Sequence, residues 1–143
     1  MIFEKIPFYK LVHPEFTLQK SICQYLNAQY PKALYLSDTV ASVKLSLPQQ
    51  CRNKSIQKDG FKCPDLLVLE PIGEFKGLFI ELKIESPFKK DGQIKASQKD
   101  HLKGQLKTIN DLKERGYYAS FSWGFDMTKQ IIDDYFNQNI SAT

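Results

Sequence analysis

Cysteine and histidine are both scarce in this 143-residue chain. The three cysteines, Cys23, Cys51 and Cys63, are odd in number and show no Cys-x-x-Cys spacing, and the two histidines are His13 and His101. A disulfide framework needs paired cysteines, and a zinc site needs clustered cysteine or histidine ligands. The sequence therefore argues against both, and its unpaired thiols favour a cytoplasmic protein.

Long apolar runs, repeats and low-complexity segments are also missing. No stretch approaches the length of a membrane-spanning helix, and the first residues lack the basic–apolar–small order of a signal peptide. With 42% hydrophobic residues and a formal net charge of +4, the chain fits a globular protein compatible with a polyanionic partner. We expect one domain over residues 1–143, with a core at about 15–136, in the cytoplasm and with no membrane partner.

The hydrophobic pattern predicts eight elements. We expect helices at about 15–30, 46–57, 98–115 and after 126, and strands at 33–36, 66–69, 78–84 and 117–123. Ser97 and Asp126 are the expected N-caps of the last two helices. A strand that follows a crossover helix can lie parallel to a hairpin strand, so we predict an α/β fold with a mixed sheet flanked by helices.

The centre of the sequence is a hairpin interrupted by charge. Asp65 opens its first strand, and Glu81 and Lys83 lie inside the second. Because side chains alternate along a strand, Glu81 and Lys83 share one face. The other face, expected to pack into the core, carries Leu78, Ile80, Leu82 and Ile84. A half-buried carboxylate and ammonium are costly unless they are paired or used, although a surface ion pair is also possible.

The residues Pro64-Asp65 and Glu81-Leu82-Lys83 resemble the PD-(D/E)XK nuclease signature. This resemblance implies that Asp65 and Glu81 bind Mg²⁺ or Mn²⁺, with the Leu82 backbone carbonyl as a further ligand, and that Lys83 lies beside the attacking water. Phosphodiester cleavage benefits from a hard cation, which takes oxygen ligands, and one or two metals are possible.

Four features together resemble the VRR-NUC branch of that superfamily, in particular its small stand-alone phage-type members. They are Glu15-x-x-x-Gln19 on an early helix, Pro64-Asp65, Glu81-Leu82-Lys83, and a helix with Gln105 before Gly116-Tyr117. The resemblance implies a restriction-endonuclease-like core. It places Glu15 and Gln105 in the catalytic site and makes Glu15 a possible metal ligand. Glu15 could instead be a first-turn carboxylate favoured by the helix dipole, and Gln105 a surface amide.

A lysine-rich stretch follows the hairpin and could track a phosphate backbone or be a solvated face. Its candidate nucleic-acid contacts are Lys89, Lys90, Lys95, Lys99, His101 and Lys103. The main hypothesis is thus a metal-dependent endonuclease that cleaves DNA. The resemblance adds selectivity for branched DNA, such as Holliday junctions or flaps, and a possible homodimer. The alternatives are a non-catalytic nucleic-acid-binding module on the same fold and a metal-free structural or inhibitor protein.

Overall fold

The computed structural model describes residues 14–37, 45–96 and 99–139. Its elements are α2 (Pro14–Gln29), β1 (Tyr35–Ser37), α3 (Leu47–Ile56), β2 (Leu66–Val68), β3 (Leu78–Lys83), α4 (Lys99–Glu114), β4 (Tyr118–Trp123) and α5 (Phe125–Phe136). The predicted order of elements is confirmed. No helix within these ranges has the length and apolar character needed to cross a membrane.

The strands form one four-stranded mixed sheet in the order β1-β2-β3-β4. β2 pairs antiparallel with both β1 and β3, so the central hairpin is confirmed. β4 pairs with β3 in parallel, after the chain has crossed over through α4. The mixed sheet and the α/β class predicted from the sequence are therefore correct.

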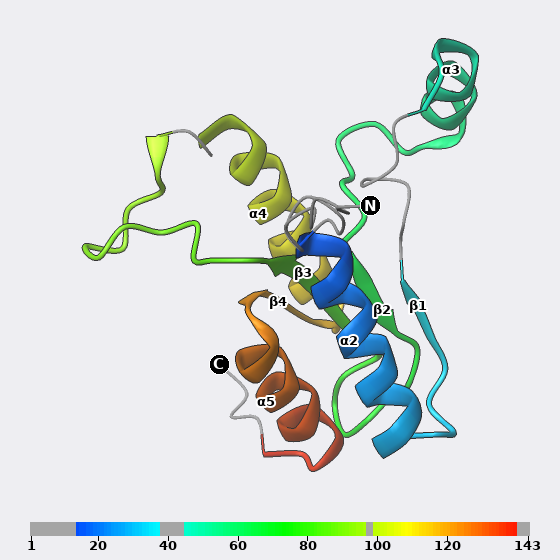
Figure 1. Cartoon of the computed structure of the whole chain (residues 1–143), viewed down its shortest axis with the longest axis vertical. Helices are drawn as coiled ribbons and strands as arrows, with labels where there is room; N and C mark the ends of the chain where they lie inside the picture. Colours follow the sequence, from blue (N-terminus) through cyan, green and yellow to red (C-terminus); the bar gives the residue numbers. More distant parts are fainter. Residues whose placement is uncertain (1–13, 38–44, 97–98, 140–143) are drawn as a thin grey trace, which may run out of the picture.

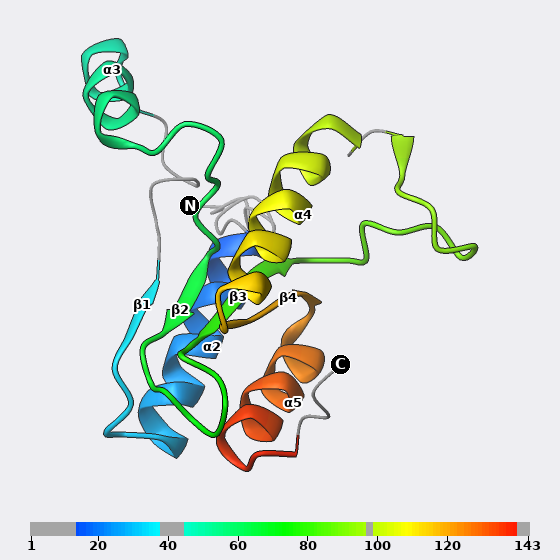
Figure 2. The same ribbon diagram turned by 180° about the vertical axis from the view of Figure 1, so that it is seen from behind.

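Helices cover both faces of the sheet (Figures 1 and 2). One hydrophobic core joins α2 and α5 to one face; its fully buried members include Ile22, Leu26, Ile80 and Ile132. A second core joins α4 to the opposite face; its members are Phe79, Leu102, Ile109, Leu112, Ala119 and Phe121. Because β3 has helices on both sides, Glu81 near the end of the strand is buried and Lys83 is partly buried.

All four strands differ from their predicted bounds by one or two residues, and the differences in β1 and β3 change which residues pair or are buried. β1 covers Tyr35–Ser37 rather than 33–36, because its pairing with β2 places Tyr35 opposite Val68 and Ser37 opposite Leu66. Ile84 was expected in the core but is 45% exposed. The reason is that β3 ends at Lys83, so Ile84 lies beyond the part of the sheet that the helices cover.

The expected N-cap of the last helix is wrong. Gly124 is the N-cap, with a positive φ of 80° that a residue without a side chain adopts readily. Helix α5 therefore begins at Phe125, and Asp126 lies in its first turn, where a carboxylate still favours the helix dipole. The predicted cap Ser97 lies outside the described residues. Gly116, expected just after the preceding helix, does end α4 with a φ of 92°.

A polar cluster fastens α2 to α5. The Asp133 carboxylate accepts hydrogen bonds from the hydroxyls of Tyr25 and Tyr30 and from Lys129 Nζ at 2.9 Å. These hydrogen bonds lower the pKa of Asp133, against the opposing effect of its partial burial. The two helices are thus joined by charge-assisted hydrogen bonds as well as by their shared core.

Helix α3 stands away from the rest of the molecule (Figure 1). It begins with a capping box, in which the Ser46 hydroxyl and the Gln49 side chain each bond the other residue's backbone N–H. It buries no residue, and Leu47 and Ile56 are 75% and 81% exposed. Its local stability therefore comes from capping rather than from packing.

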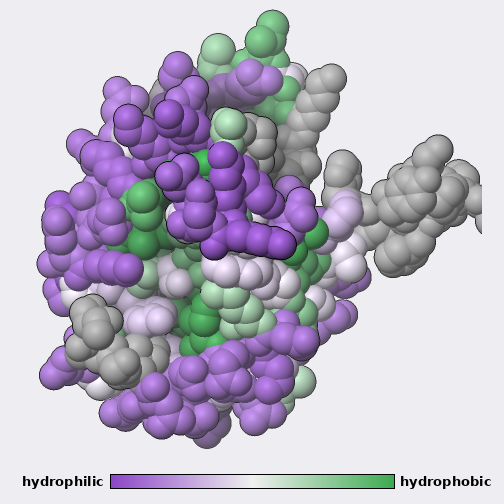
Figure 3. Space-filling view, turned by 90° about the vertical axis from the view of Figure 1, so that its left-hand side faces the viewer, coloured by the Kyte–Doolittle hydropathy of each residue, from purple (hydrophilic) through white to green (hydrophobic). Residues whose placement is uncertain are grey.

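The segment between β3 and α4 projects from another side of the molecule (Figure 2). The Phe88 ring packs edge-on against Phe121 and Trp123, and Phe88 pairs with Ile94 in an isolated β-bridge. The face from which this segment extends is largely hydrophilic, with apolar side chains visible in the hollows between polar ones (Figure 3). The segment is thus held by its aromatic contact, while Lys89 and Lys90 are exposed.

Candidate active site

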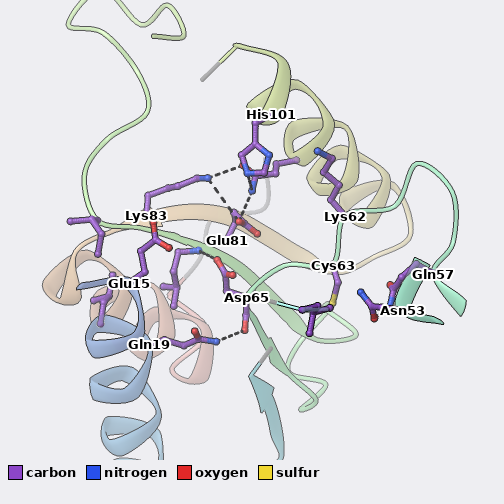
Figure 4. A pocket seen from close by; sticks show the side chains of 15 residues that line it. Glu15, Gln19, Asn53, Gln57, Lys62, Cys63, Asp65, Glu81, Lys83 and His101 are labelled. Carbon is purple, nitrogen blue, oxygen red and sulfur yellow. Dashed lines mark hydrogen bonds and ion pairs between the residues drawn. The ribbon is translucent and has the colours of Figure 1, made fainter. Parts of the chain in front are cut away.

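A cavity of about 510 Å³ brings together residues from distant parts of the sequence. It lies where α2, the entry to β2, the end of β3 and the N-terminal half of α4 meet (Figure 4). All five residues predicted to be catalytic line it: Glu15, Asp65, Glu81, Lys83 and Gln105. The structure thus places them around one space, although their sequence positions span ninety residues.

Asp65 is fixed at the mouth of β2 by contacts on both sides. Its Oδ2 accepts a hydrogen bond from the Leu82 backbone N–H at 2.8 Å, and its own carbonyl accepts from Gln19 Nε2 at 3.3 Å. Leu66 pairs with Ile80, so the antiparallel register, continued by one residue, places Asp65 opposite Glu81. The two carboxylates therefore meet because of the hairpin register rather than through loop geometry.

Glu81 is a buried acid, with 7% of its surface exposed. Its Oε1 accepts a hydrogen bond from Gln105 Nε2 at 2.6 Å and lies 3.9 Å from Lys83 Nζ. Burial, and then the nearby charge of Asp65, raise the pKa of Glu81 to about 8, against the opposing attraction of Lys83. A pair of carboxylates that repel each other in a poorly hydrated place favours a bound cation.

Gln105 links the charged residues of β3 to helix α4. Its Oε1 accepts a hydrogen bond from Lys83 Nζ at 2.8 Å, while its Nε2 lies 3.1 Å from His101 Nε2. Because an amide nitrogen can only donate, the ring nitrogen of His101 is the acceptor in this contact. Burial and the charges of Lys83 and Lys62 lower the pKa of His101, which agrees with a neutral ring.

Glu15 and Leu82 occupy the margin of this arrangement. Glu15 lies in the first turn of α2, is exposed, and lines the cavity below Lys83 (Figure 4). Leu82 lies on the cavity wall between Glu81 and Lys83, with its N–H bound to Asp65. Both remain predicted contributors to a metal site.

The residues present fit a hard divalent cation. Within the described parts of the chain, no three His, Cys, Asp or Glu side chains gather in a preformed cluster. Asp65 and Glu81 therefore offer two carboxylates, with Glu15 at the cavity margin. Mg²⁺ is commonly held by one or two carboxylates, with water and substrate phosphate as the other ligands, so two are sufficient. Such a cation would therefore need no cysteine or histidine ligand at this site.

Most of the predicted nucleic-acid contacts lie away from the cavity. His101 lines it, whereas the lysines of the β3–α4 segment and of the α4 surface do not: Lys89, Lys90, Lys95, Lys99 and Lys103. Four of these five are exposed, and Lys95 is intermediate. They remain predicted contacts with a substrate that extends beyond the site.

Several residues of the cavity are not predicted from the sequence. Asn53 and Gln57 reach it from the region of α3, and Lys62 and Cys63 line it just before Asp65 (Figure 4). Lys62 lies three residues before Asp65 in the sequence, and this short spacing could have identified it as a neighbour of the site. No sequence signal connects Asn53 or Gln57 with a cavity, since α3 has no buried face.

Comparisons with known proteins bear on the fold. No family model matches the chain, and no curated protein matches it. A solved structure described as a VRR_NUC domain protein resembles it with a TM-score of 0.57, covering 86% of this chain and 88% of that chain. The sequence identity is 20%, so the likeness establishes the fold. The fold expected from the VRR-NUC resemblance is thereby confirmed.

Proposed function

We propose that the protein is a metal-dependent nuclease that hydrolyses DNA phosphodiester bonds at the cavity between α2, β3 and α4. The observation that carries this proposal is the buried Glu81 carboxylate opposite Asp65, with Lys83 and Gln105 in hydrogen-bonding reach of one another. A structural ion pair alone would not require a second carboxylate against Glu81. A nuclease requires that arrangement, because a cation must be held next to a phosphate.

The roles of the residues follow from their positions. Asp65 and Glu81 would hold Mg²⁺ or Mn²⁺, with the Leu82 carbonyl and Glu15 as further candidate ligands. When bound, such an ion lowers the pKa of a water and neutralises charge on the phosphate. The Lys83 ammonium would orient the attacking water and stabilise the charge that develops on the phosphate oxygens. Gln105 would keep Lys83 and Glu81 in place, since its amide contacts both.

The proposal is tested with purified protein on labelled Holliday-junction, flap, duplex and single-stranded DNA in Mg²⁺, Mn²⁺ or EDTA. Cleavage should require the metal and should be lost in Lys83→Ala. The matched control is Lys113→Ala, which removes an exposed lysine at the far end of α4. Equal cleavage by the Lys83→Ala and wild-type preparations would assign the activity to a contaminant and refute the proposal.

Substrate selectivity and assembly form the finer part of the proposal. We expect branched DNA to be preferred, with a homodimer presenting two sites to a junction. The preferred substrate in the cleavage panel tests the first expectation, and the mass in solution under assay conditions tests the second. A monomer that cuts linear duplex as fast as a junction would contradict both.

A non-catalytic nucleic-acid-binding module is the alternative. The carboxylate pair disfavours it, because an acidic pair that holds no cation at the centre of a phosphate-binding surface would weaken binding. Binding of equal strength in EDTA and Mg²⁺, with no cleavage of any substrate, would favour this alternative.

A further inference from the structure

Lys62 approaches the cavity along helix α4. Its backbone N–H donates a hydrogen bond of 3.0 Å to the hydroxyl of Thr108, which is 1% exposed. From this anchor its side chain runs toward the N-terminal end of α4, where His101 lies (Figure 4). Thr108, Gly104 and His101 are spaced by four and three residues, so they form one stripe along the helix. The Lys62 side chain follows that stripe.

Gly104 leaves room for this side chain. A Cβ placed on Gly104 would lie 2.8 Å from Lys62 Cε, 3.1 Å from Cδ and 3.4 Å from Nζ. Glycine within a helix costs about 1 kcal/mol relative to alanine. No positive φ requires glycine at this position, since Gly104 is absent from the residues with that conformation. An alanine at this position would therefore have to displace the end of the Lys62 side chain.

The Lys62 ammonium adds positive charge to a wall that already contains Lys83. The two lysines approach His101 from opposite sides (Figure 4), and both lower its pKa. Lys83 lies beside Glu81, but none of the ion pairs within residues 14–37, 45–96 and 99–139 involves Lys62. An ammonium that lines the cavity without an acidic partner there is suited to a ligand's anionic group.

We propose that Lys62, laid over Gly104, forms a phosphate-binding subsite that holds a backbone phosphate of the nucleic acid next to the one that is cleaved. The inference rests on the proposed function for the identity of the ligand. It differs from the roles assigned above, because Lys62 would bind the substrate and would not act on the reacting phosphate.

The matched variants separate charge from packing. Lys62→Met keeps an unbranched stem over Gly104 and removes the ammonium, whereas Lys62→Arg keeps a positive charge. Lys113→Met is the control for the loss of one positive charge elsewhere on α4. Binding of a short duplex oligonucleotide is measured in EDTA over a series of salt concentrations, so that no cleavage occurs.

Loss of one phosphate contact should make the slope of log K against log salt shallower by about 0.9 for duplex DNA. We expect this change, together with weaker binding, in Lys62→Met, and recovery in Lys62→Arg. Equal affinity and equal salt slope in Lys62→Met and Lys113→Met would overturn the inference.

Gly104→Ala gives an independent test of the geometry. Alanine favours the helix, so thermal stability should be maintained or rise, while the displaced Lys62 should weaken oligonucleotide binding. Increased stability with unchanged binding would mean that the position of Lys62 is unimportant. An NMR titration of His101 adds a readout without any ligand: its pKa should rise in Lys62→Met, and no change would place the ammonium elsewhere.

Failure of this inference can be told from failure of the proposed function. Lys62-dependent binding in EDTA without cleavage in Mg²⁺ or Mn²⁺ would support the phosphate subsite and refute the nuclease. Metal-dependent cleavage, with binding that does not depend on Lys62, would support the nuclease and refute the phosphate subsite. A wild-type protein that does not bind the oligonucleotide in EDTA would overturn the subsite.

Discussion

Replacing Glu81 with glutamine should make the free energy of unfolding less dependent on pH. The side chain keeps its shape and its hydrogen bond from Gln105, but it loses the charge that is buried opposite Asp65. The pKa of Glu81 is raised from 4.5 to about 8 in the folded protein. The stabilising effect of its proton is therefore complete below pH 4.5 and is lost as the pH rises toward and past 8.

The size of the effect follows from these pKa values. Each pH unit between 4.5 and about 8 is equivalent to about 1.4 kcal/mol. The full loss is thus at most about 5 kcal/mol, and relaxation of Asp65 and entry of water reduce it. Urea unfolding at pH 5 and pH 9 in EDTA measures this loss in wild type and in Glu81→Gln. Most other groups titrate alike in the two proteins, so their contributions cancel in the comparison. Between pH 5 and pH 9, the free energy of unfolding should fall by several kcal/mol less in Glu81→Gln than in wild type.

Adding Mg²⁺ provides the second half of the experiment. A cation that binds only the folded state stabilises it by about 2.7 kcal/mol at one hundred times its Kd. Wild type should show this gain at pH 9, where Glu81 is ionised, and Glu81→Gln should show little of it. The same pH dependence in both proteins, or an equal response to Mg²⁺, would refute the reasoning that Asp65 and Glu81 form a cation site.

Three further predictions follow from other contacts. Lys83→Met should lower kcat for cleavage by about 100- to 1,000-fold while metal binding, measured by calorimetry, is retained; unchanged kcat would remove Lys83 from the site. His101→Gln keeps an acceptor for the Gln105 amide and should cleave faster than His101→Lys, which can only donate; the reverse order would favour a phosphate contact by a cationic residue. Asp133→Ala should cost about 1–3 kcal/mol in urea unfolding, because Tyr30 and its neighbours lose a charged acceptor, and the cleavage rate per folded molecule should stay the same.

The sequence was most informative where a local pattern determines the structure. Two apolar runs on either side of a turn-rich connection identified the β2–β3 hairpin, and the register of that hairpin puts Asp65 opposite Glu81. The stripe of apolar residues on α4 and the glycine that follows it placed that helix correctly. Since these are the elements that build the cavity, the predicted catalytic residues came together in the structure.

Which residues face the cavity depends on tertiary contacts, and this could not be predicted from the sequence. The lysines of α4 are recognisable as a basic stretch, but which side of the helix faces the cavity depends on how α4 packs on the sheet. That packing turns His101 and Gln105 inward and leaves Lys99 and Lys103 outside. The position of Lys62 over Gly104 joins residues forty-two positions apart, and neither residue indicates it alone.

The cavity has walls of very different structural origin. Asp65, Glu81 and Gln105 lie on or beside strands and a helix that are packed into two hydrophobic cores. The wall near Asn53 belongs to α3, a helix in which no residue is buried. Amino-acid changes in α3 therefore cost little folding free energy, whereas changes beneath the carboxylates cost much. Under the proposed nuclease function, a library of α3 variants is therefore the natural starting point for altering substrate preference without disturbing the residues around Glu81.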